Sequence, residues 1–223
     1  MKKRHIAAAF IILVAAWQAI AMLVRIPILP TPLKVLGVLV TELRGDLPLH
    51  FAASLWRVTI GMLLSVFLAA PAGLMIGQSQ KLNRIFSPFI YLLYPIPKVV
   101  LLTILMLFLG VGDTSKVALI FLILFFQILV LVRDQAATIP LQLIQSLRSL
   151  GAGRRALFRF VYFPASLPAI LTALRQSVGT AVAVLYVAEL FATRLGLGYY
   201  IYFQGSTLLN YPAMYAGVVA MSL

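Results

Sequence analysis

Long apolar stretches separated by short polar segments make up most of the chain. A helix needs roughly 20 apolar residues to cross a bilayer core about 30 Å thick. Five stretches reach or approach that length, namely residues 6–24, 54–78, 85–110, 117–132 and 167–190. A sixth begins at Pro212 and is still apolar where the sequence stops at Leu223, so we expect the last helix to be truncated. The pattern predicts an all-α, polytopic membrane protein with a bundle of about six transmembrane helices.

The fourth stretch is the shortest of the five, and Lys116 and Arg133 flank it. Long basic side chains can extend their charges along a helix toward the membrane interface. We therefore expect Lys116 and Arg133 to reach the two interfaces. Within the spans, small residues favour close helix contact, and they include Gly61, Gly73, Gly77 and Gly179.

The basic residues are distributed unevenly between the two sides of the membrane. With the N-terminus inside, the inner loops hold ten basic residues, Lys2, Lys3, Arg4, Lys81, Arg84, Arg133, Arg148, Arg154, Arg155 and Arg159, and one acid, Asp134. The outer segments hold Arg25, Lys34, Arg44, Arg57, Lys116 and Arg194 together with Glu42, Asp46 and Asp113. The positive-inside rule therefore predicts a cytoplasmic N-terminus. A cleaved signal peptide is the alternative, because Ala19-Ile20-Ala21 resembles a cleavage site.

The chain divides into three predicted parts. Residues 1–29 form an N-terminal transmembrane helix, residues 30–53 a periplasmic interfacial segment, and residues 54–223 a core domain. The interfacial segment carries apolar residues at helical spacing, namely Leu33, Leu36, Val40 and Leu43, so it predicts a short helix. On the same outer side, residues 196–200 predict a turn followed by an aromatic belt of Tyr199, Tyr200 and Tyr202.

The longest cytoplasmic loop, residues 134–165, has internal order that a plain connector does not need. Pro140 suits the first position of a helix, and Gly151 suits the position just past its end. Leu143, Leu147 and Leu150 lie between them at i, i+4 and i+7, which predicts an amphipathic helix of about three turns. The helix either lies on the membrane surface or docks into a groove on a partner protein, and periodicity leaves both interpretations open.

Composition and charge exclude several function classes. The chain is 63% apolar and 10% charged, and its +13 net charge lies in short clusters between apolar runs, so nucleic-acid binding is not expected. There is no cysteine, and both histidines, His5 and His50, lie outside the long apolar runs. We therefore expect no metal site and no catalytic site within the membrane.

Several motifs resemble the permease subunits of bacterial ATP-binding-cassette (ABC) importers. Residues 145–151 read Gln-Ser-Leu-Arg-Ser-Leu-Gly and are followed by the Leu167-Pro168 pair, which is similar to the cytoplasmic signature loop of those permeases. Further likeness to the nitrate, sulfonate, taurine and bicarbonate branch lies in Ser-Leu-Trp-Arg at 54–57 before Gly61, Tyr-Pro-Ile-Pro-Lys at 94–98, the segment 109–116, and Ala-Glu-Leu at 188–190 before residues 196–199. The resemblance covers about residues 30–220.

This resemblance implies a type I importer permease in the bacterial inner membrane, with three kinds of protein partner besides membrane lipid. These are a dimer of cytoplasmic ABC ATPases, which would bind the ATP, a second permease copy or close relative, and a periplasmic or lipid-anchored substrate-binding protein. The permease would need no cofactor and would hydrolyse nothing itself. The helix of the cytoplasmic loop would be the coupling helix, and the implied ATPase-coupling residues are Leu143, Gln145, Ser146, Leu147, Arg148, Leu150, Gly151, Arg154 and Arg155. Gln145-Ser146-Leu147 replaces the usual Glu-Ala-Ala, which removes a negative charge and enlarges one small position.

Polar residues at membrane depth are the candidates for a translocation path, because they are costly there unless they face a bundle interior or water. They are Lys98, Gln127, Arg175, Gln176, Ser177 and Glu189. Two basic groups against one acid favour an anionic solute such as nitrate, a sulfonate or bicarbonate. The alternative is that Arg175 and Glu189 are structural and pair with backbone groups near the interfaces. Pro95 and Pro97 are the candidate hinge, because proline removes backbone hydrogen bonds.

Other functions remain open at this stage. A secondary transporter or channel without an ATPase is the main alternative, although it would be favoured by paired acids in the membrane, and Glu189 is the only acid in the predicted spans. An intramembrane enzyme is disfavoured because the spans hold no histidine and no acid pair.

Overall fold

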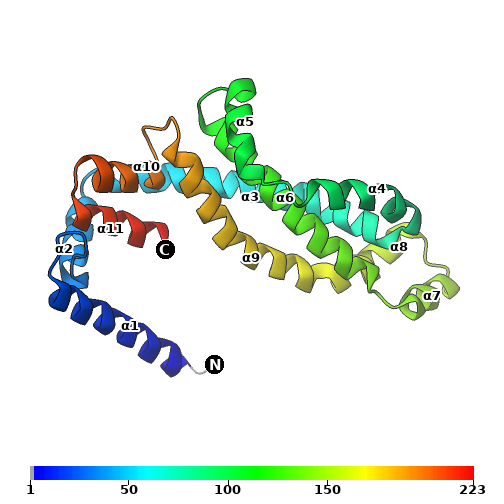
Figure 1. Cartoon of the computed structure of the whole chain (residues 1–223). Helices are drawn as coiled ribbons and strands as arrows, with labels where there is room; N and C mark the ends of the chain where they lie inside the picture. The colour runs from blue at the N-terminus through cyan, green and yellow to red at the C-terminus, as the bar shows by residue number, and fades with distance from the viewer. Residues whose placement is uncertain (1–2) are drawn as a thin grey trace. The chain divides into compact units, whose positions relative to one another are not determined.

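The computed structural model describes residues 3–223, and that part of the chain is helical and contains no strand (Figure 1). The long helices are α1 (Lys3–Val24), α3 (Leu47–Gln78), α6 (Asp113–Ala137) and α9 (Phe163–Leu190). The shorter ones are α2 (Pro32–Glu42), α4 (Gln80–Leu93), α5 (Leu101–Leu109), α7 (Leu141–Ser149), α8 (Arg154–Leu157), α10 (Leu197–Tyr202) and α11 (Tyr211–Met221). A 3₁₀ turn, η1 (Lys98–Val100), precedes α5, and π-helical turns, η2 (Phe158–Tyr162) and η3 (Phe203–Thr207), follow α8 and α10.

Within residues 3–223, four helices are long and apolar enough to cross a membrane, and a bent pair adds a fifth if it counts as one span. The four are Arg4–Val24, Leu47–Gln78, Asp113–Ala137 and Arg155–Leu190, and the pair joins Gln80–Leu93 to Lys98–Leu109 across a 70° bend. The predicted all-α polytopic membrane fold is therefore confirmed.

Two predicted span starts lie furthest from those in the structure. The second span begins at Leu47 and not at Ser54, because Pro48 falls in the first turn of α3, where a missing N–H does no harm. The fifth begins near Arg155, because the π-helical turn η2 joins α8 to α9 without a stop and Pro168 lies inside α9. A π-helical turn changes the hydrogen-bond register, which lets a helix continue through such positions.

The chain forms two compact units, and the first comprises Met1–Leu55 and Glu189–Leu223. Its small core contains Leu47, Leu197, Tyr200, Ala213 and Ala220. Helix α2 begins at the cap Thr31, whose side-chain oxygen accepts a hydrogen bond from the Lys34 backbone N–H at 3.4 Å. This confirms the short helix predicted for the interfacial segment.

The second unit is Trp56–Ala188 and contains most of α3, most of α9 and the helices between them. Glycines on α3 bring it against α6. A Cβ on Gly61 would lie 2.6 Å from the Ile120 side chain, and one on Gly73 would lie 2.8 Å from the Leu129 carbonyl oxygen. A Cβ on Gly77 would likewise lie too close to the Arg133 backbone, whereas a Cβ on Gly179 would have no neighbouring atom within 4 Å. The close-contact prediction therefore holds for three of these glycines but not for Gly179.

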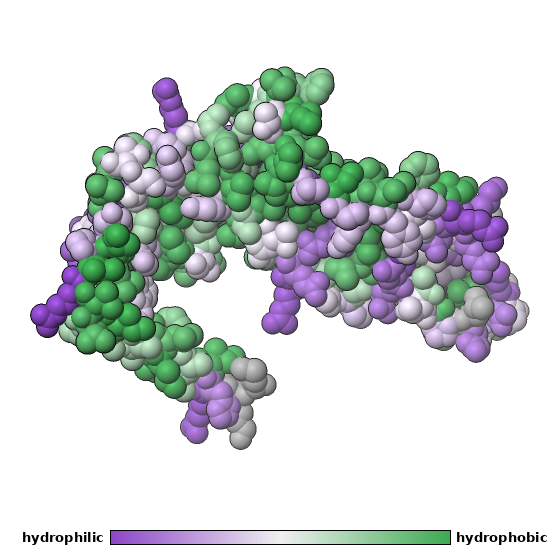
Figure 2. Space-filling view, in the orientation of Figure 1, coloured by the Kyte–Doolittle hydropathy of each residue, from purple (hydrophilic) through white to green (hydrophobic). Residues whose placement is uncertain are grey.

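The outer surface of both units is rich in apolar side chains, as Figure 2 shows. Phe108 is 84% exposed in the second unit and Leu13 is 69% exposed in the first. Large aliphatic and aromatic groups exposed in this way suit a hydrocarbon solvent and not water.

The prediction that Lys116 and Arg133 extend to the interfaces is wrong. Lys116 is 1% exposed, and its Nζ donates to the Gly112 carbonyl at 3.1 Å. Arg133 is also buried, where its Nη2 donates to Asp134 Oδ1 at 2.7 Å and to the Tyr91 hydroxyl at 3.2 Å. Local hydrogen-bond acceptors hold both cations within the protein, so neither needs an interface.

Candidate functional site

A polar cavity in the second unit brings together three of the residues predicted for the path. It measures about 380 Å³, and Lys98 of η1, Gln127 of α6 and Gln176 of α9 contribute its polar lining. The remaining lining residues are Tyr94, Ile123, Phe126, Val130 and Leu131. Three segments far apart in sequence therefore present one cation and two amides to the same space.

The break between α4 and α5 positions Lys98. Pro95 and Pro97 interrupt the helix, and Lys98 Nζ donates to the Tyr94 carbonyl at 2.8 Å. The same ammonium lies 4.8 Å from the centre of the Phe126 ring, a distance at which cation–π attraction operates. The cavity lining includes no acid, so the Lys98 charge gives it a positive potential.

Polar groups continue along the facing sides of α6 and α9. A second cavity of about 270 Å³ shares Leu131 with the first and is lined by Gln135 of α6 and Thr172 of α9, with Ala165, Pro168 and Ala169. Gln127, Leu131 and Gln135 are spaced four residues apart, so they lie on one face of α6. Pro168, Thr172 and Gln176 repeat the same spacing on α9.

The other predicted path residues lie outside these two cavities. Arg175 is exposed and lines neither of them. Ser177 is buried, and its hydroxyl has no hydrogen-bond partner among the described residues.

Glu189 belongs to a buried hydrogen-bond cluster in the first unit. The Ser54 hydroxyl lies 2.8 Å and 2.9 Å from its two carboxyl oxygens, and the Gly198 N–H donates to Oε2 at 2.8 Å. The Leu197 N–H donates in turn to Ser54 Oγ at 2.7 Å. Glu189 is fully buried, and its bonds satisfy backbone donors at the start of α10, which an α-helix leaves without intrahelical partners. Bonds of this kind, to backbone groups at a helix end, are those that the structural alternative for Glu189 predicts.

His50 completes this cluster one helical turn before Ser54. Its Nδ1 accepts a hydrogen bond from the Gly196 N–H at 3.0 Å. Gly196 has φ +136°, a conformation that favours glycine, so the turn after α9 depends on that residue. This cluster was not predicted from the sequence, although His50 and Ser54 are four residues apart and Glu189 precedes a Gly-x-Gly turn.

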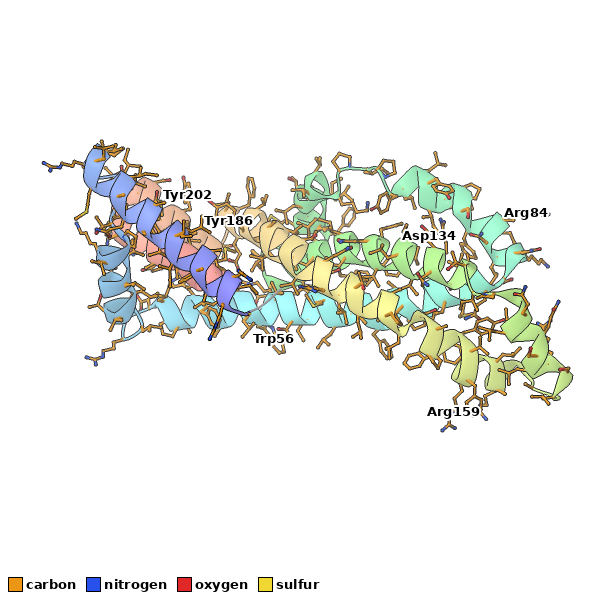
Figure 3. All side chains as sticks on the ribbon, turned by 90° about the horizontal axis from the view of Figure 1, so that it is seen from below. Trp56, Arg84, Asp134, Arg159, Tyr186 and Tyr202 are labelled. Atoms are coloured by element: carbon orange, nitrogen blue, oxygen red, sulfur yellow. The ribbon has the colours of Figure 1, made fainter. Side chains whose placement is uncertain are left out.

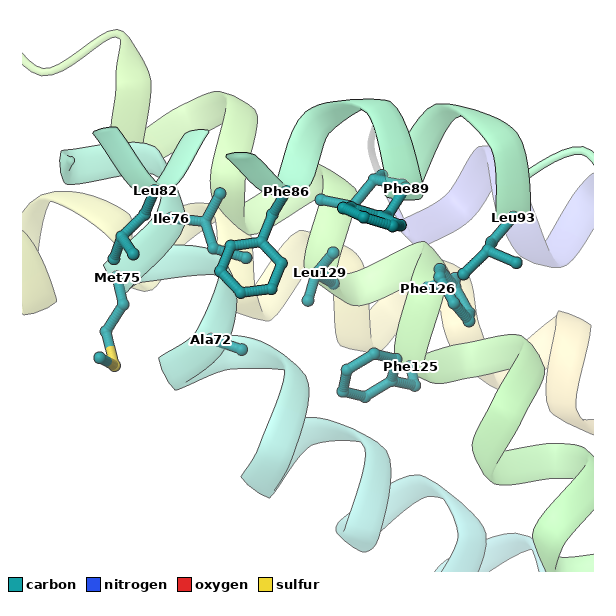
Figure 4. A pocket seen from close by; sticks show the side chains of 11 residues that line it. Ala72, Met75, Ile76, Leu82, Phe86, Phe89, Leu93, Phe125, Phe126 and Leu129 are labelled. Atoms are coloured by element: carbon teal, nitrogen blue, oxygen red, sulfur yellow. The ribbon is translucent and has the colours of Figure 1, made fainter. Parts of the chain in front are cut away.

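A further cavity of the second unit is apolar throughout and is therefore unsuited to a polar solute. It measures about 440 Å³ and lies between α3, α4 and α6. Figure 4 shows the rings of Phe86, Phe89, Phe125 and Phe126 around it. Its lining contains no hydrogen-bonding side chain.

The helix predicted in the cytoplasmic loop is confirmed as α7. The helix begins at Leu141, so Pro140 is its N-cap and not its first residue as predicted. Gly151 lies just past its end and has φ +81°. The Ala152 N–H donates to the Leu147 carbonyl at 3.0 Å, and the Gly151 N–H donates to the Arg148 carbonyl at 2.9 Å. This pair of bonds is the Schellman motif, which requires a left-handed residue at Gly151.

The apolar residues of α7 do not share one role. Ile144 and Leu147 pack against a small core of Ile139, Leu157 and Val161, which fixes the helix on the start of α9. Leu143 is 53% exposed and Leu150 is 82% exposed. The interpretation of Leu143, Leu147 and Leu150 as one apolar face is therefore wrong for Leu147.

The remaining residues predicted for coupling lie at the surface of this loop. Gln145, Ser146, Arg148 and Arg155 are exposed, and the Arg154 side chain lies outside the described part of the structure. Arg159, which follows them on η2, points away from the helix (Figure 3). The exposed surface of α7 and α8 is therefore polar and basic. Leu143 of α7 and Leu150, the residue after α7, are exposed apolar residues beside it.

Two charged contacts of the second unit were not predicted. Arg57 of α3 donates to Asp113 Oδ1 at 2.9 Å from Nε and at 2.7 Å from Nη2, which holds the start of α6 against α3. The Arg133 guanidinium lies 5.2 Å from the Tyr91 ring and joins α6 to α4. In the first unit, Tyr200 is buried, so the predicted aromatic belt is wrong at that position.

A polytopic helical bundle that encloses a basic cavity with no acid in its lining has the features of a membrane permease.

The chain belongs to the binding-protein-dependent transport system inner membrane component family, whose model matches residues 61–223. It is 31% identical over 220 residues to the taurine transport system permease protein TauC of Escherichia coli strain K12, covering 95% of this chain and 80% of that protein. It is 31% identical over 193 residues to the putative aliphatic sulfonates transport permease protein SsuC of Bacillus subtilis strain 168, covering 85% and 70%. The formylaminopyrimidine transport permease protein ThiX of Halalkalibacterium halodurans is 29% identical over 215 residues, covering 96% and 86%.

The fold also matches a solved transporter. A chain of the MetNI methionine ABC transporter, in an inward-facing conformation, superimposes with a TM-score of 0.64 at 20% identity and covers 81% of this chain and 87% of that chain. The architecture is therefore that of a type I ABC importer permease. The protein is the transmembrane permease of an ATP-driven importer, an inner membrane component that works with an ATPase and a substrate-binding protein.

Proposed function

We propose that this permease conducts a small anion and that the Lys98 cavity is part of its path. The observation that carries the proposal is a cavity with one ammonium group, two amides and no acid in its lining. An anion entering it would gain charge-assisted hydrogen bonds from Lys98 and neutral ones from Gln127 and Gln176. A cation would be repelled by the Lys98 ammonium there.

The names of the relatives support a solute of this kind. Taurine and aliphatic sulfonates both carry a sulfonate group, which is anionic at neutral pH. Sulfonate has three acceptor oxygens, and the cavity offers donors from three different segments. Formylaminopyrimidine, named for another relative, has no such charge, so the anion preference stands on the Lys98 geometry.

The proposed partners follow from the described surfaces. An ATPase of the importer would contact the exposed residues of α7, chiefly Leu143, Gln145, Ser146, Arg148 and Leu150, with Arg154 and Arg155 of α8 beside them. Leu147 would act indirectly by holding α7 on its small core, and Gly151 by closing the end of the helix. A second permease copy or a close relative would complete the membrane part.

The topology proposed from the basic residues places the N-terminus in the cytoplasm and residues 30–53 on the periplasmic side. The division into residues 1–29, 30–53 and 54–223 stays a proposal of the same kind. In alternating access, closure of the ATPases would push α7, and the break at Pro95 and Pro97 would act as a hinge beside Lys98. Arg175 would contribute its charge in another state of the cycle, because it is exposed here.

Substitution of Lys98 tests the anion path. We expect Lys98→Met to lower ATP-dependent uptake of taurine and ethanesulfonate into proteoliposomes of the complete importer about tenfold, because one charge-assisted hydrogen bond is lost. Lys98→Arg should retain most of the uptake. Lys81→Met is the matched control, because Lys81 is an exposed lysine on α4 outside the cavity.

The readouts separate the path from other roles. Recovery of the ATPase with each purified variant shows that assembly is intact. Anion uptake by Lys98→Met at the level of the Lys81→Met control would refute the proposal. Uptake that continues without ATP would favour a secondary transporter.

A further inference from the structure

Leu131 of α6 lies between two polar cavities of the second unit. It lines the Lys98 cavity of about 380 Å³. It also lines the cavity of about 270 Å³ that contains Gln135 and Thr172. No other described residue lines both, so the two polar spaces meet at this one apolar side chain.

Polar residues of α6 lie on either side of Leu131. Gln127 precedes it by four residues and Gln135 follows it by four, so the three side chains lie along one face of the helix. At a rise of about 1.5 Å per residue, each of these steps covers about 6 Å. An anion that moves from one amide to the other therefore passes a leucine side chain, which offers it no hydrogen bond.

The two cavities differ in charge. The Lys98 cavity has an ammonium group, whereas Gln135 and Thr172 supply the polar side chains of the second cavity, whose described lining holds no charged one. The Thr172 hydroxyl already donates to the Pro168 carbonyl at 2.8 Å. The Gln135 amide is thus the main donor there, so an anion would be held strongly beside Lys98 and weakly beside Gln135. Weak binding suits a site from which a solute is released.

The second cavity lies where α6 ends and α9 begins, next to the loop that carries α7. Gln135 is two residues before the end of α6, and Ala165 is two residues after the start of α9. Ala165 also packs against the small core that holds Ile144 and Leu147 of α7. One wall of the cavity is therefore in contact with the core that fixes α7.

We propose that the cavity of Gln135 and Thr172 is the release site of the path, and that Leu131 is the apolar barrier between it and the Lys98 cavity. The ligand is the small anion of the proposed function, on which this inference rests. An apolar constriction of this kind opposes the passage of an ion by excluding water. Movement of α7 would reach the release site through the core that contains Ala165.

Cysteine accessibility tests the two sites without measuring transport. The chain has no cysteine, so an introduced one is the single thiol of the permease. The probe is the anionic reagent sulfonatoethyl methanethiosulfonate, added without ATP on the ATPase side of proteoliposomes of the complete importer. Mass spectrometry of the permease gives the labelling rate. We expect Gln127→Cys to react at least about tenfold more slowly than Thr172→Cys, because Leu131 separates Gln127 from that side.

Substitutions of Leu131 make the test specific. Leu131→Gln keeps a similar side-chain size and adds an amide between those of Gln127 and Gln135, so it should raise the labelling rate of Gln127→Cys about tenfold. It should also allow ethanesulfonate to leave loaded proteoliposomes without ATP. Leu131→Met stays apolar and should keep the slow rate. Leu171→Ala is the control, because Leu171 is exposed on α9 and lines neither cavity.

The labelling rates decide both parts of the inference. Equal rates for Thr172→Cys and Gln127→Cys, or an unchanged rate in an assembled Leu131→Gln variant, would overturn the barrier. An unreactive Thr172→Cys would overturn the release site. Recovery of the ATPase with each purified variant shows that it is assembled.

A cationic reagent separates this inference from the anion preference. Trimethylammonioethyl methanethiosulfonate is the matched probe of opposite charge. If Leu131→Gln speeds labelling by both reagents equally, Leu131 is a barrier but the path does not prefer anions, and the proposal for Lys98 fails alone. If Lys98→Met lowers anion uptake but no Leu131 variant changes either rate, the proposed function stands and the barrier is refuted.

Discussion

The Glu189 cluster and the Lys98 cavity both bring polar groups together, but those groups bond to one another in the first region and line a cavity in the second. Around Glu189, the carboxyl oxygens, the Ser54 hydroxyl and the first N–H groups of α10 bond to one another within a closed interior. Around Lys98, Gln127 and Gln176, polar groups face an open space of about 380 Å³.

The difference separates structural from functional polar residues in a membrane protein. A polar group away from water needs hydrogen-bond partners. A group whose hydrogen bonds are all made within the protein has no donor or acceptor left for a solute. A group that keeps bonding capacity toward a cavity is able to meet a solute. On this criterion we propose that Glu189 is structural, whereas Lys98, Gln127 and Gln176 stay candidates for the path.

The largest expected effect is the loss of stability in Glu189→Ala. The substitution leaves the Ser54 hydroxyl and the Gly198 N–H without their acceptor inside a closed interior, at a cost of about 3 kcal/mol in the free energy of unfolding. Thermal unfolding in detergent measures it as a marked fall in Tm.

Arg175→Ala is the matched control for that experiment. Arg175 is exposed, so its removal should leave the Tm close to that of the unsubstituted chain. An equal Tm for both variants would contradict the assignment of Glu189 as structural.

A pair of glycines compares packed with open helix surfaces in the second unit. Gly77→Ala places a methyl group against the Arg133 carbonyl and 2.7 Å from the Ala136 side chain, which should destabilise the chain by about 2 kcal/mol. Gly179→Ala meets open space, and alanine is the better helix former, so that variant should be equally or slightly more stable. Chemical denaturation of the two variants side by side measures the difference. Equal loss of stability would show that the α9 surface at Gly179 is not open.

The sequence predicted much of the fold because its signals are local. Apolar stretch length located the spans, and the Pro140 and Gly151 pair bounded α7 within one residue. The proline pair at 95 and 97 was likewise enough to indicate the break beside Lys98.

The polar contacts were harder to predict because they join distant segments. Ser54 meets Glu189 across 135 positions, and Arg57 meets Asp113 across 56. No periodicity reveals which charged residue at membrane depth finds its partner within the protein. Lys116 and Arg133 were missed for a different reason: their acceptors Gly112 and Asp134 are close in sequence, but periodicity does not show that a cation is held locally.

The smallest expected effect comes from two buried serines. Ser54→Ala removes an acceptor from the Leu197 N–H and a donor from Glu189, so we expect a loss of about 1.5 kcal/mol in unfolding free energy. Ser177 is equally buried but has no hydrogen-bond partner among the described residues, so Ser177→Ala should leave stability unchanged or slightly increased.

Combining unfolding with anion uptake for both variants separates the two possible roles of Ser177. If Ser177→Ala keeps its stability but loses anion uptake, Ser177 belongs with Lys98 among the residues of the translocation path. If Ser177→Ala loses stability, Ser177 has a hydrogen-bond partner, as Ser54 does. The hydrogen bonds made within the protein would then not distinguish the Glu189 cluster from the Lys98 cavity.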